Sequence, residues 1–111
     1  MILQNKSIKK VGVIIRPSTP ELKSSFFQLK EILKTHDIEV YIDSISGGMI
    51  DVMGMEFDLL CKQCDALVTL GGDGTLISAV RRSFNYDIPI FGVYAGALGF
   101  LADVSMDELD D

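Results

Sequence analysis

An α/β domain with a mostly parallel sheet is predicted by three features of this 111-residue sequence. Short continuous apolar runs, among them Val11–Ile15 and Asp65–Leu70, alternate with segments of helical periodicity. Hydrophobic residues make up 48% of the chain, which is typical of parallel strands that are buried on both faces. A glycine-rich turn, Gly71–Thr75, joins one apolar run directly to a helical pattern. The length suffices for one compact domain with a single core.

The first half of the chain predicts a strand, a helix and a second strand. Val11–Ile15 is the first strand, and the turn Arg16–Glu21 leads into the helix. Apolar residues recur there at helical spacing and form one stripe: Leu22, Phe26, Leu29, Ile32 and Leu33. Ile38–Ile42 is the second strand. The polar segment Asp43–Gly48 is interpreted as a loop, while Met49–Gly54 fits more than one structure.

The second half of the chain again alternates between predicted helices and strands. A short helix over Glu56–Cys64 is followed by a third strand over Asp65–Leu70. Beyond the glycine turn, a helix is predicted from Leu76 to Phe84. Its expected apolar face consists of Leu76, Ile77, Val80 and Phe84. Ile88–Val93 is a fourth strand, and a capping box at Ser105 predicts the start of another helix.

The turn Gly71–Thr75 is the first candidate site. It lies between a strand and a helix, where open α/β sheets bind ligands. Its glycines expose backbone N–H groups, and the start of the following helix adds further donors, so the site suits phosphate. Asp73 is unusual in such a place, because a carboxylate repels phosphate. It can cap the helix, hold a metal that bridges to phosphate, or accept a proton from an attacking hydroxyl.

A second glycine-containing loop, Tyr94–Leu101, follows the fourth strand. If the third and fourth strands are neighbours, this loop faces the first one across a crevice. Its Phe100 either stacks on a base or nicotinamide ring or belongs to the core. Arg16, at the end of the first strand, either faces a bound phosphate or is a solvated surface charge.

Composition excludes several classes of function. The net charge of −6 argues against a nucleic-acid partner, which requires a basic surface. The N-terminus has no secretory signal pattern, and the longest apolar run is too short and glycine-rich to span a membrane, so we expect a cytoplasmic protein. Cys61 and Cys64, with one histidine in the chain, cannot form a four-ligand zinc site. Buried thiols are favoured over a redox pair, which would normally lie at a strand-to-helix turn.

Two motifs together resemble the N-terminal domain of NAD kinases. Gly71–Ile77 resembles the glycine-aspartate loop of that family, and Gly92–Asp103 resembles its second loop. Diacylglycerol and sphingosine kinases share the first motif, and phosphofructokinases have a close variant. The second motif separates NAD kinases from these relatives. There are two alternative interpretations: a lipid or sugar kinase, and a flavodoxin-like binding module without catalysis.

The resemblance implies a three-layer α/β/α, Rossmann-like domain with a mostly parallel sheet. It implies that Asp73 activates the 2′-hydroxyl of the adenosine ribose of NAD for attack on the γ-phosphate of ATP. The positions that it assigns to the phosphates, the adenosine and the dinucleotide are Gly71, Gly72, Gly74, Thr75, Ile77, Leu98, Phe100 and Leu101. ATP, NAD and Mg²⁺ or another divalent cation are the implied ligands, and no residue of the chain is assigned to the metal.

The chain departs from the family pattern at three positions. Tyr94 stands where many members have Asn or His, Ala97 where they have a larger polar or basic residue, and Ser78 where some have a basic one. Members also continue into a second, mostly β domain that begins with an Asn-Glu or Asn-Asp motif. We therefore expect residues 1–111 to be the N-terminal domain of a longer, homo-oligomeric protein and to have little kinase activity alone.

Overall fold

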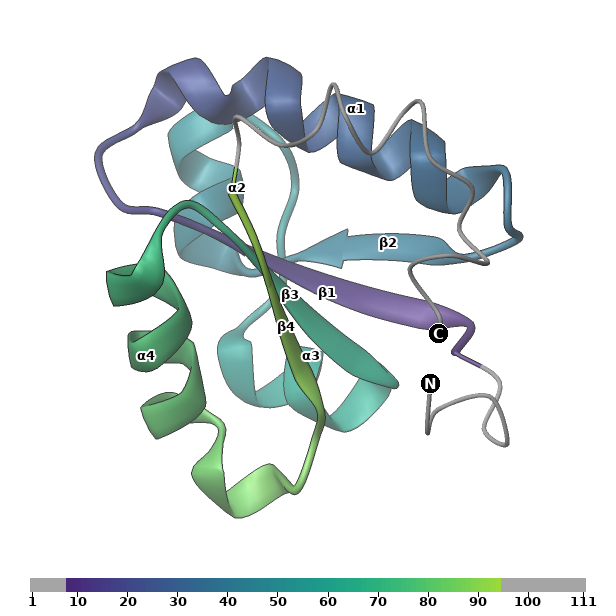
Figure 1. The fold of residues 1–111 in the computed structure, drawn as a ribbon, viewed down its shortest axis with the longest axis vertical. Helices are drawn as coiled ribbons and strands as arrows, with labels where there is room; N and C mark the ends of the chain where they lie inside the picture. The colour runs from purple at the N-terminus through teal and green to yellow at the C-terminus, as the bar shows by residue number, and fades with distance from the viewer. Residues whose placement is uncertain (1–7, 95–111) are drawn as a thin grey trace.

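The computed structural model describes residues 8–94, which form one parallel sheet covered by helices on both faces (Figure 1). The strands are β1 (Lys10–Ile15), β2 (Glu39–Ile42), β3 (Ala66–Leu70) and β4 (Ile90–Val93). Their order in the sheet is β2-β1-β3-β4, and all three pairings are parallel. The predicted α/β class is therefore confirmed, and the third and fourth strands, whose adjacency the sequence left open, are neighbours.

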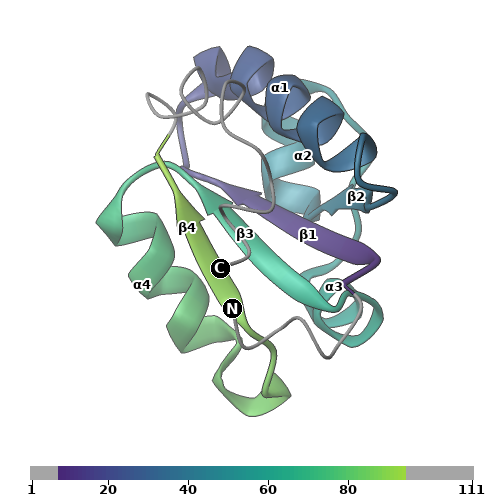
Figure 2. The same ribbon diagram turned by 45° about the vertical axis from the view of Figure 1, so that its right-hand side comes forward.

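The helices form the two outer layers. They are α1 (Lys23–Lys34), α2 (Ser44–Ile50), α3 (Phe57–Gln63) and α4 (Asp73–Arg82), with 3-10 turns η2 (Pro20–Leu22) and η3 (Phe84–Tyr86). Figure 2 shows α1 on one side of the sheet and α3 and α4 on the other. This is the expected three-layer α/β/α arrangement.

The core consists of two clusters, one on each face of the sheet. Strand β1 contributes Val11, Val13 and Ile15 to the α1 face and Ile14 to the opposite face, because successive strand residues alternate. The predicted stripe of α1 is buried on the first face at Phe26, Leu29 and Leu33. All five residues of β3 are buried, as expected for a central parallel strand.

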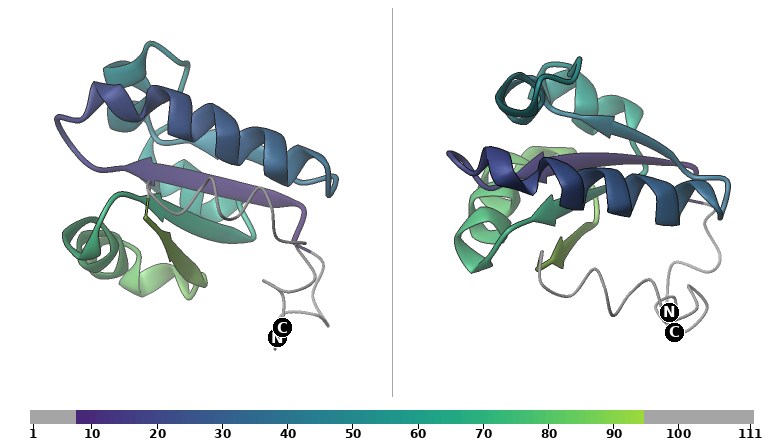
Figure 3. Two further views of the ribbon diagram at one scale, coloured as in Figure 1. Left: turned by 45° about the horizontal axis from the view of Figure 1, so that its top comes forward. Right: turned by 90° about the horizontal axis from the view of Figure 1, so that it is seen from above.

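The strand order places a ligand crevice at the carboxyl ends of β1 and β3. From β1 the chain continues to β2 on one side, whereas β3 lies on the other side and continues to β4. The connections that follow β1 and β3 therefore lead to opposite faces, and Figure 3 shows α1 and α4 on either side of the strands. Open α/β sheets bind ligands at such a switch point.

The interpretation of Asp43–Gly48 as a loop is wrong, because Ser44–Ile50 forms helix α2. Gly47 and Gly48 lower helix propensity and resemble turn residues in the sequence. Gly47 is required for another reason: a Cβ there would lie 2.4 Å from the carbonyl oxygen of Val52. The glycine permits close packing of the helix against the chain that follows it.

The predicted apolar face of the fourth helix is also wrong in part. Helix α4 begins at Asp73, three residues before the predicted start, and it turns Thr75 and Ala79 toward the sheet. Ile77, Val80 and Phe84 are instead exposed by 51%, 46% and 81%. Small side chains suit the buried face, because α4 packs closely: a Cβ at Gly92 of β4 would lie 3.1 Å from Leu76.

The two cysteines are buried free thiols, which confirms that prediction. Burial raises the pKa of both thiols, that of Cys64 to about 11, so they stay protonated at neutral pH. Within residues 8–94, no helix is long and apolar enough to cross a membrane. The helix predicted at Ser105 lies outside the described residues.

Candidate functional site

The glycine turn connects β3 to α4. Hydrogen bonds join its start to the ends of β1 and β4, the two strands that lie beside β3. The Arg16 N–H donates to the carbonyl oxygen of Leu70 at 2.9 Å, and the Gly71 N–H donates to that of Val93 at 3.1 Å. Gly71 has a φ of +157°, and a Cβ there would lie 2.8 Å from both Arg16 Cβ and Thr75 Oγ1. Glycine is therefore needed at this position by backbone conformation and by close packing.

Asp73 is the first residue of α4, and its side chain is exposed. Gly72 occupies the N-cap position, where no side chain makes a capping hydrogen bond. The carboxylate therefore does not serve as the helix cap, which was one of the three roles considered from the sequence. It lies at the positive end of the helix dipole, which stabilises a negative charge.

Tyr94 provides a polar contact to this carboxylate. Its hydroxyl donates a hydrogen bond to Asp73 Oδ1 from the residue that follows β4. This bond raises the pKa of Tyr94, so the phenol stays neutral and remains a donor at physiological pH. The departure from the family pattern at Tyr94 thus retains a polar group beside Asp73.

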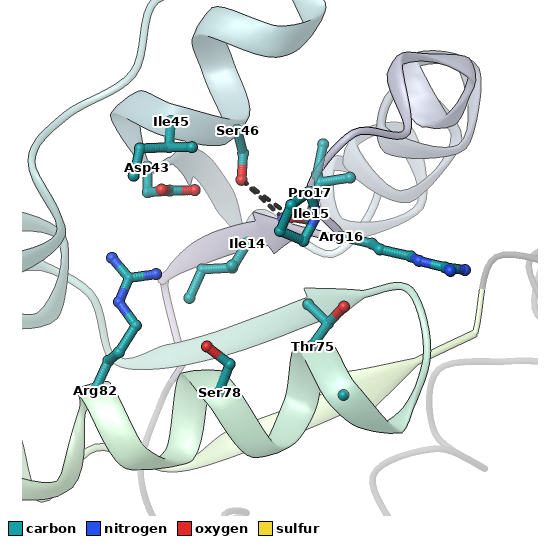
Figure 4. Close-up of a pocket in the computed structure, with 11 residues that line it drawn as sticks. Ile14, Ile15, Arg16, Pro17, Asp43, Ile45, Ser46, Thr75, Ser78 and Arg82 are labelled. Carbon is teal, nitrogen blue, oxygen red and sulfur yellow. Dashed lines mark hydrogen bonds between the residues drawn. The ribbon is translucent and has the colours of Figure 1, made fainter.

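A cavity of about 360 Å³ opens beside the start of α4 (Figure 4). Its volume lies within the range of small-molecule sites. It is lined by the end of β1, the start of α2 and one face of α4: Ile14, Ile15, Arg16, Pro17, Asp43, Ile45, Ser46, Gly74, Thr75, Ser78 and Arg82. The guanidinium of Arg82 and a helix N-terminus border the cavity and favour an anionic ligand, whereas the Arg16 side chain extends away from Asp43, Ser46 and Arg82 (Figure 4).

The structure brings some of the predicted site residues together. Gly74, Thr75 and Arg16 line the cavity, and Asp73 directly precedes Gly74 in the chain. Arg16 was left open between phosphate contact and surface charge; it lines the cavity, but its side chain extends away from the other polar lining residues (Figure 4), so its role stays a prediction. Ile77 lies outside the cavity lining and is half exposed. The predicted positions in the second loop, Leu98, Phe100 and Leu101, lie outside the described residues.

Apart from Ser78, which was noted only as a departure from the family pattern, three polar residues of the cavity were not predicted from the sequence: Asp43, Ser46 and Arg82. Asp43 had a recognisable signal, because it directly follows the second strand and therefore lies at the ligand-binding edge of a parallel sheet. Ser46 and Arg82 belong to helices, α2 and α4, whose predicted extent or orientation was wrong. No pattern in the sequence turns either residue toward this edge.

Comparison with models of protein families identifies the family of this chain. Residues 11–111 match the family model described as the ATP-NAD kinase N-terminal domain. The chain belongs to the NAD kinase family. The match spans both glycine-containing loops, and the described part of the family domain is the same α/β sheet that presents Asp73 at its edge.

Curated NAD kinases of several bacteria are similar over almost the whole chain. A protein named NAD kinase from Sulfurimonas denitrificans is 58% identical over 97% of this chain. Those from Helicobacter hepaticus and Wolinella succinogenes are 59% and 55% identical over 95% and 94% of it. The chain spans 38%, 35% and 36% of the lengths of these three relatives. The matched part is the one that the family model describes as the N-terminal domain.

Proposed function

We propose that this NAD kinase domain, extended to the length of its relatives, transfers the γ-phosphate of ATP to the 2′-hydroxyl of the adenosine ribose of NAD. The observation that carries the proposal is the exposed Asp73 carboxylate, held by Tyr94 beside a cavity that suits phosphate. A carboxylate at a phosphate-binding helix start is unfavourable unless it has a task in the reaction. Accepting the proton of the attacking hydroxyl is such a task.

In the proposed reaction, Asp73 orients the 2′-hydroxyl and takes its proton as the oxygen attacks the γ-phosphorus. The bond from that phosphorus to the β–γ bridging oxygen breaks, and ADP leaves. The hydrogen bond from Tyr94 engages Oδ1, so the second carboxylate oxygen can accept the substrate hydrogen. Backbone N–H groups at the start of α4 and the guanidinium of Arg16 stabilise the phosphate charge.

A divalent cation is expected to accompany ATP. Mg²⁺ is commonly held by one or two carboxylates together with substrate phosphates. Residues 8–94 contain no group of three or more His, Cys, Asp or Glu side chains able to hold a metal by themselves. The cation would therefore take most of its ligands from the phosphates and neutralise their charge. The part of the relatives that lies beyond the matched region would complete the contacts to NAD.

Acceptor specificity tests the proposal. The extended protein is incubated with γ-labelled ATP and Mg²⁺ and, separately, with NAD, diacylglycerol, sphingosine or fructose 6-phosphate. We expect label on NAD alone, at the ribose 2′-oxygen. NADP is the matched control, since its 2′-position is already phosphorylated and should take no label. Label on a lipid or a sugar, with none on NAD, would contradict the proposed function and favour one of the other kinase classes.

A further inference from the structure

The side chain of Asp43 is buried and has an unused hydrogen-bond acceptor. Asp43 follows β2 directly, is 2% exposed and lines the cavity described above. Within the described part of the chain, its Oδ1 atom has no hydrogen-bond partner. Leaving a buried charged acceptor unpaired is costly, so such an atom indicates a partner that binds from outside the chain.

Neither Ser46 nor Arg82, the polar neighbours of Asp43 in the cavity, forms a hydrogen bond or ion pair with its carboxyl group. The Ser46 hydroxyl accepts a hydrogen bond from the Ile15 N–H at 2.9 Å and so fixes the start of α2 against the end of β1. The guanidinium of Arg82 lies over the ring of Phe57, 4.0 Å from its centroid. Figure 4 shows Asp43 between these two residues at the edge of the cavity.

The backbone holds Asp43 firmly in this position. Its N–H donates to the carbonyl oxygen of Val13 at 3.2 Å, and its carbonyl oxygen accepts from the Gly47 N–H at 2.8 Å. Gly54 packs so closely that a Cβ there would lie 2.5 Å from the Asp43 carbonyl oxygen. The group is therefore pre-positioned for a ligand.

The position of Asp43 matches a general mode of nucleotide recognition. In dinucleotide-binding α/β folds, an acidic residue about 20 residues beyond the phosphate-binding turn accepts hydrogen bonds from ribose hydroxyls. Asp43 stands in the corresponding relation to the end of β1, since β1 and β2 are parallel neighbours. The same cavity offers Arg82 and the start of α4 to phosphates (Figure 4). A ligand that carries both hydroxyls and phosphates satisfies all of these groups.

We propose that Asp43 binds the ribose hydroxyls of the nucleoside triphosphate that donates the phosphate, an inference that rests on the proposed kinase function. The donor is favoured over NAD, because the reacting ribose of NAD must reach Asp73, which is not among the residues that line the cavity. A metal ion is disfavoured as the partner of Asp43, because Asp43 is the only carboxylate among the lining residues and the guanidinium of Arg82 borders the same cavity (Figure 4).

Nucleotides that lack the ribose hydroxyls test this assignment in the extended protein. We expect unaltered protein to bind 2′,3′-dideoxy-ATP about 10- to 100-fold more weakly than ATP, the effect of losing hydrogen bonds to a charged group. In Asp43→Asn the two nucleotides should bind within about threefold of each other, because the charged acceptor is gone. Titration calorimetry gives the four dissociation constants, and thermal melting checks that the variant is folded.

Two further variants keep the test specific. Asp58→Asn removes an exposed carboxylate of α3 that pairs with Lys62 at 3.1 Å, and it should leave the preference for ATP unchanged. Asp43→Glu keeps the charge and should retain a preference for ATP, which gives a second measurement if Asp43→Asn fails to fold. Equal binding of ATP and its dideoxy analogue by unaltered protein would overturn the inference, as would a full preference in Asp43→Asn.

The assay of NADP formation on the same preparations separates this inference from the proposed function. Discrimination that depends on Asp43 without NADP formation would refute the kinase proposal and retain a nucleoside triphosphate site. NADP formation without such discrimination would refute the role of Asp43 alone. A loss of affinity in Asp43→Asn that is equal for both nucleotides would show that Asp43 only shapes the cavity, and would also overturn the inference.

Discussion

Replacing Asp73 with Asn is expected to lower kcat for NADP formation by about 10²- to 10⁴-fold, the usual contribution of a positioned general base. The amide has nearly the same shape and can still accept the hydrogen bond from Tyr94, but it cannot take a proton from the attacking hydroxyl. The KM values for ATP and NAD should change far less than kcat, because the loss concerns the transition state. Steady-state kinetics of the extended protein give both quantities.

Asp58 supplies a closely matched control. Like Asp73 it is exposed, lies in the first turn of a helix and accepts a hydrogen bond from a tyrosine hydroxyl, here that of Tyr86. That bond, with help from Lys62, holds the pKa of Asp58 below its usual value. Asp58→Asn should therefore affect folding about as much as Asp73→Asn while leaving kcat unchanged. NADP formation by Asp73→Asn within a few-fold of the unaltered rate would show that the assigned role is wrong.

Replacing Gly71 with Ala is expected to destabilise the domain by about 1–3 kcal/mol and to reduce kcat by about 100-fold. The added methyl group meets Arg16 Cβ and Thr75 Oγ1 at 2.8 Å, in a backbone conformation that L-residues rarely adopt. Relief of this clash must move the turn that carries Asp73, and displacements of about 1 Å can cost that much in rate. Urea unfolding and steady-state kinetics measure the two effects.

Gly72 is the control for this substitution, because a Cβ at Gly72 has no atom within 4 Å and its φ of −124° is ordinary. Gly72→Ala should change the free energy of unfolding by no more than about 0.5 kcal/mol. Equal stability of the Gly71→Ala and Gly72→Ala proteins would mean that the close packing of Gly71 against Arg16 and Thr75 does not contribute to stability.

Local patterns were sufficient to predict the parts of the fold that depend on neighbouring residues. The strand, turn and helix around Gly71–Thr75 are such a case, because burial of β3 and the glycines act within one stretch of sequence. The stripe of α1 is another, since apolar spacing alone determines which side is buried. Strand order was not predictable, because apolar runs do not specify their neighbours in the sheet.

The incorrect predictions concern helices whose extent or orientation depends on packing between segments that are distant in the sequence. Gly47 resembles a turn residue but allows α2 to approach Val52. Ile77 and Val80 resemble a core face, yet α4 turns the smaller Thr75 and Ala79 to the sheet because little space is available there. The position of Asp43 after the second strand indicates only that it lies at the ligand-binding edge; its place in the cavity depends on the pairing of β2 with β1, which apolar runs do not specify.

The most direct measurement of the central claim is the distance between the Asp73 carboxylate and the 2′-oxygen of the NAD adenosine ribose, taken from a crystal structure of the extended protein with NAD and a non-hydrolysable ATP analogue. The account predicts about 2.6–3.2 Å, the reach of a hydrogen bond to a general base. A 2′-oxygen that lies beyond this reach, with no single water molecule bridging it to Asp73, would contradict the account.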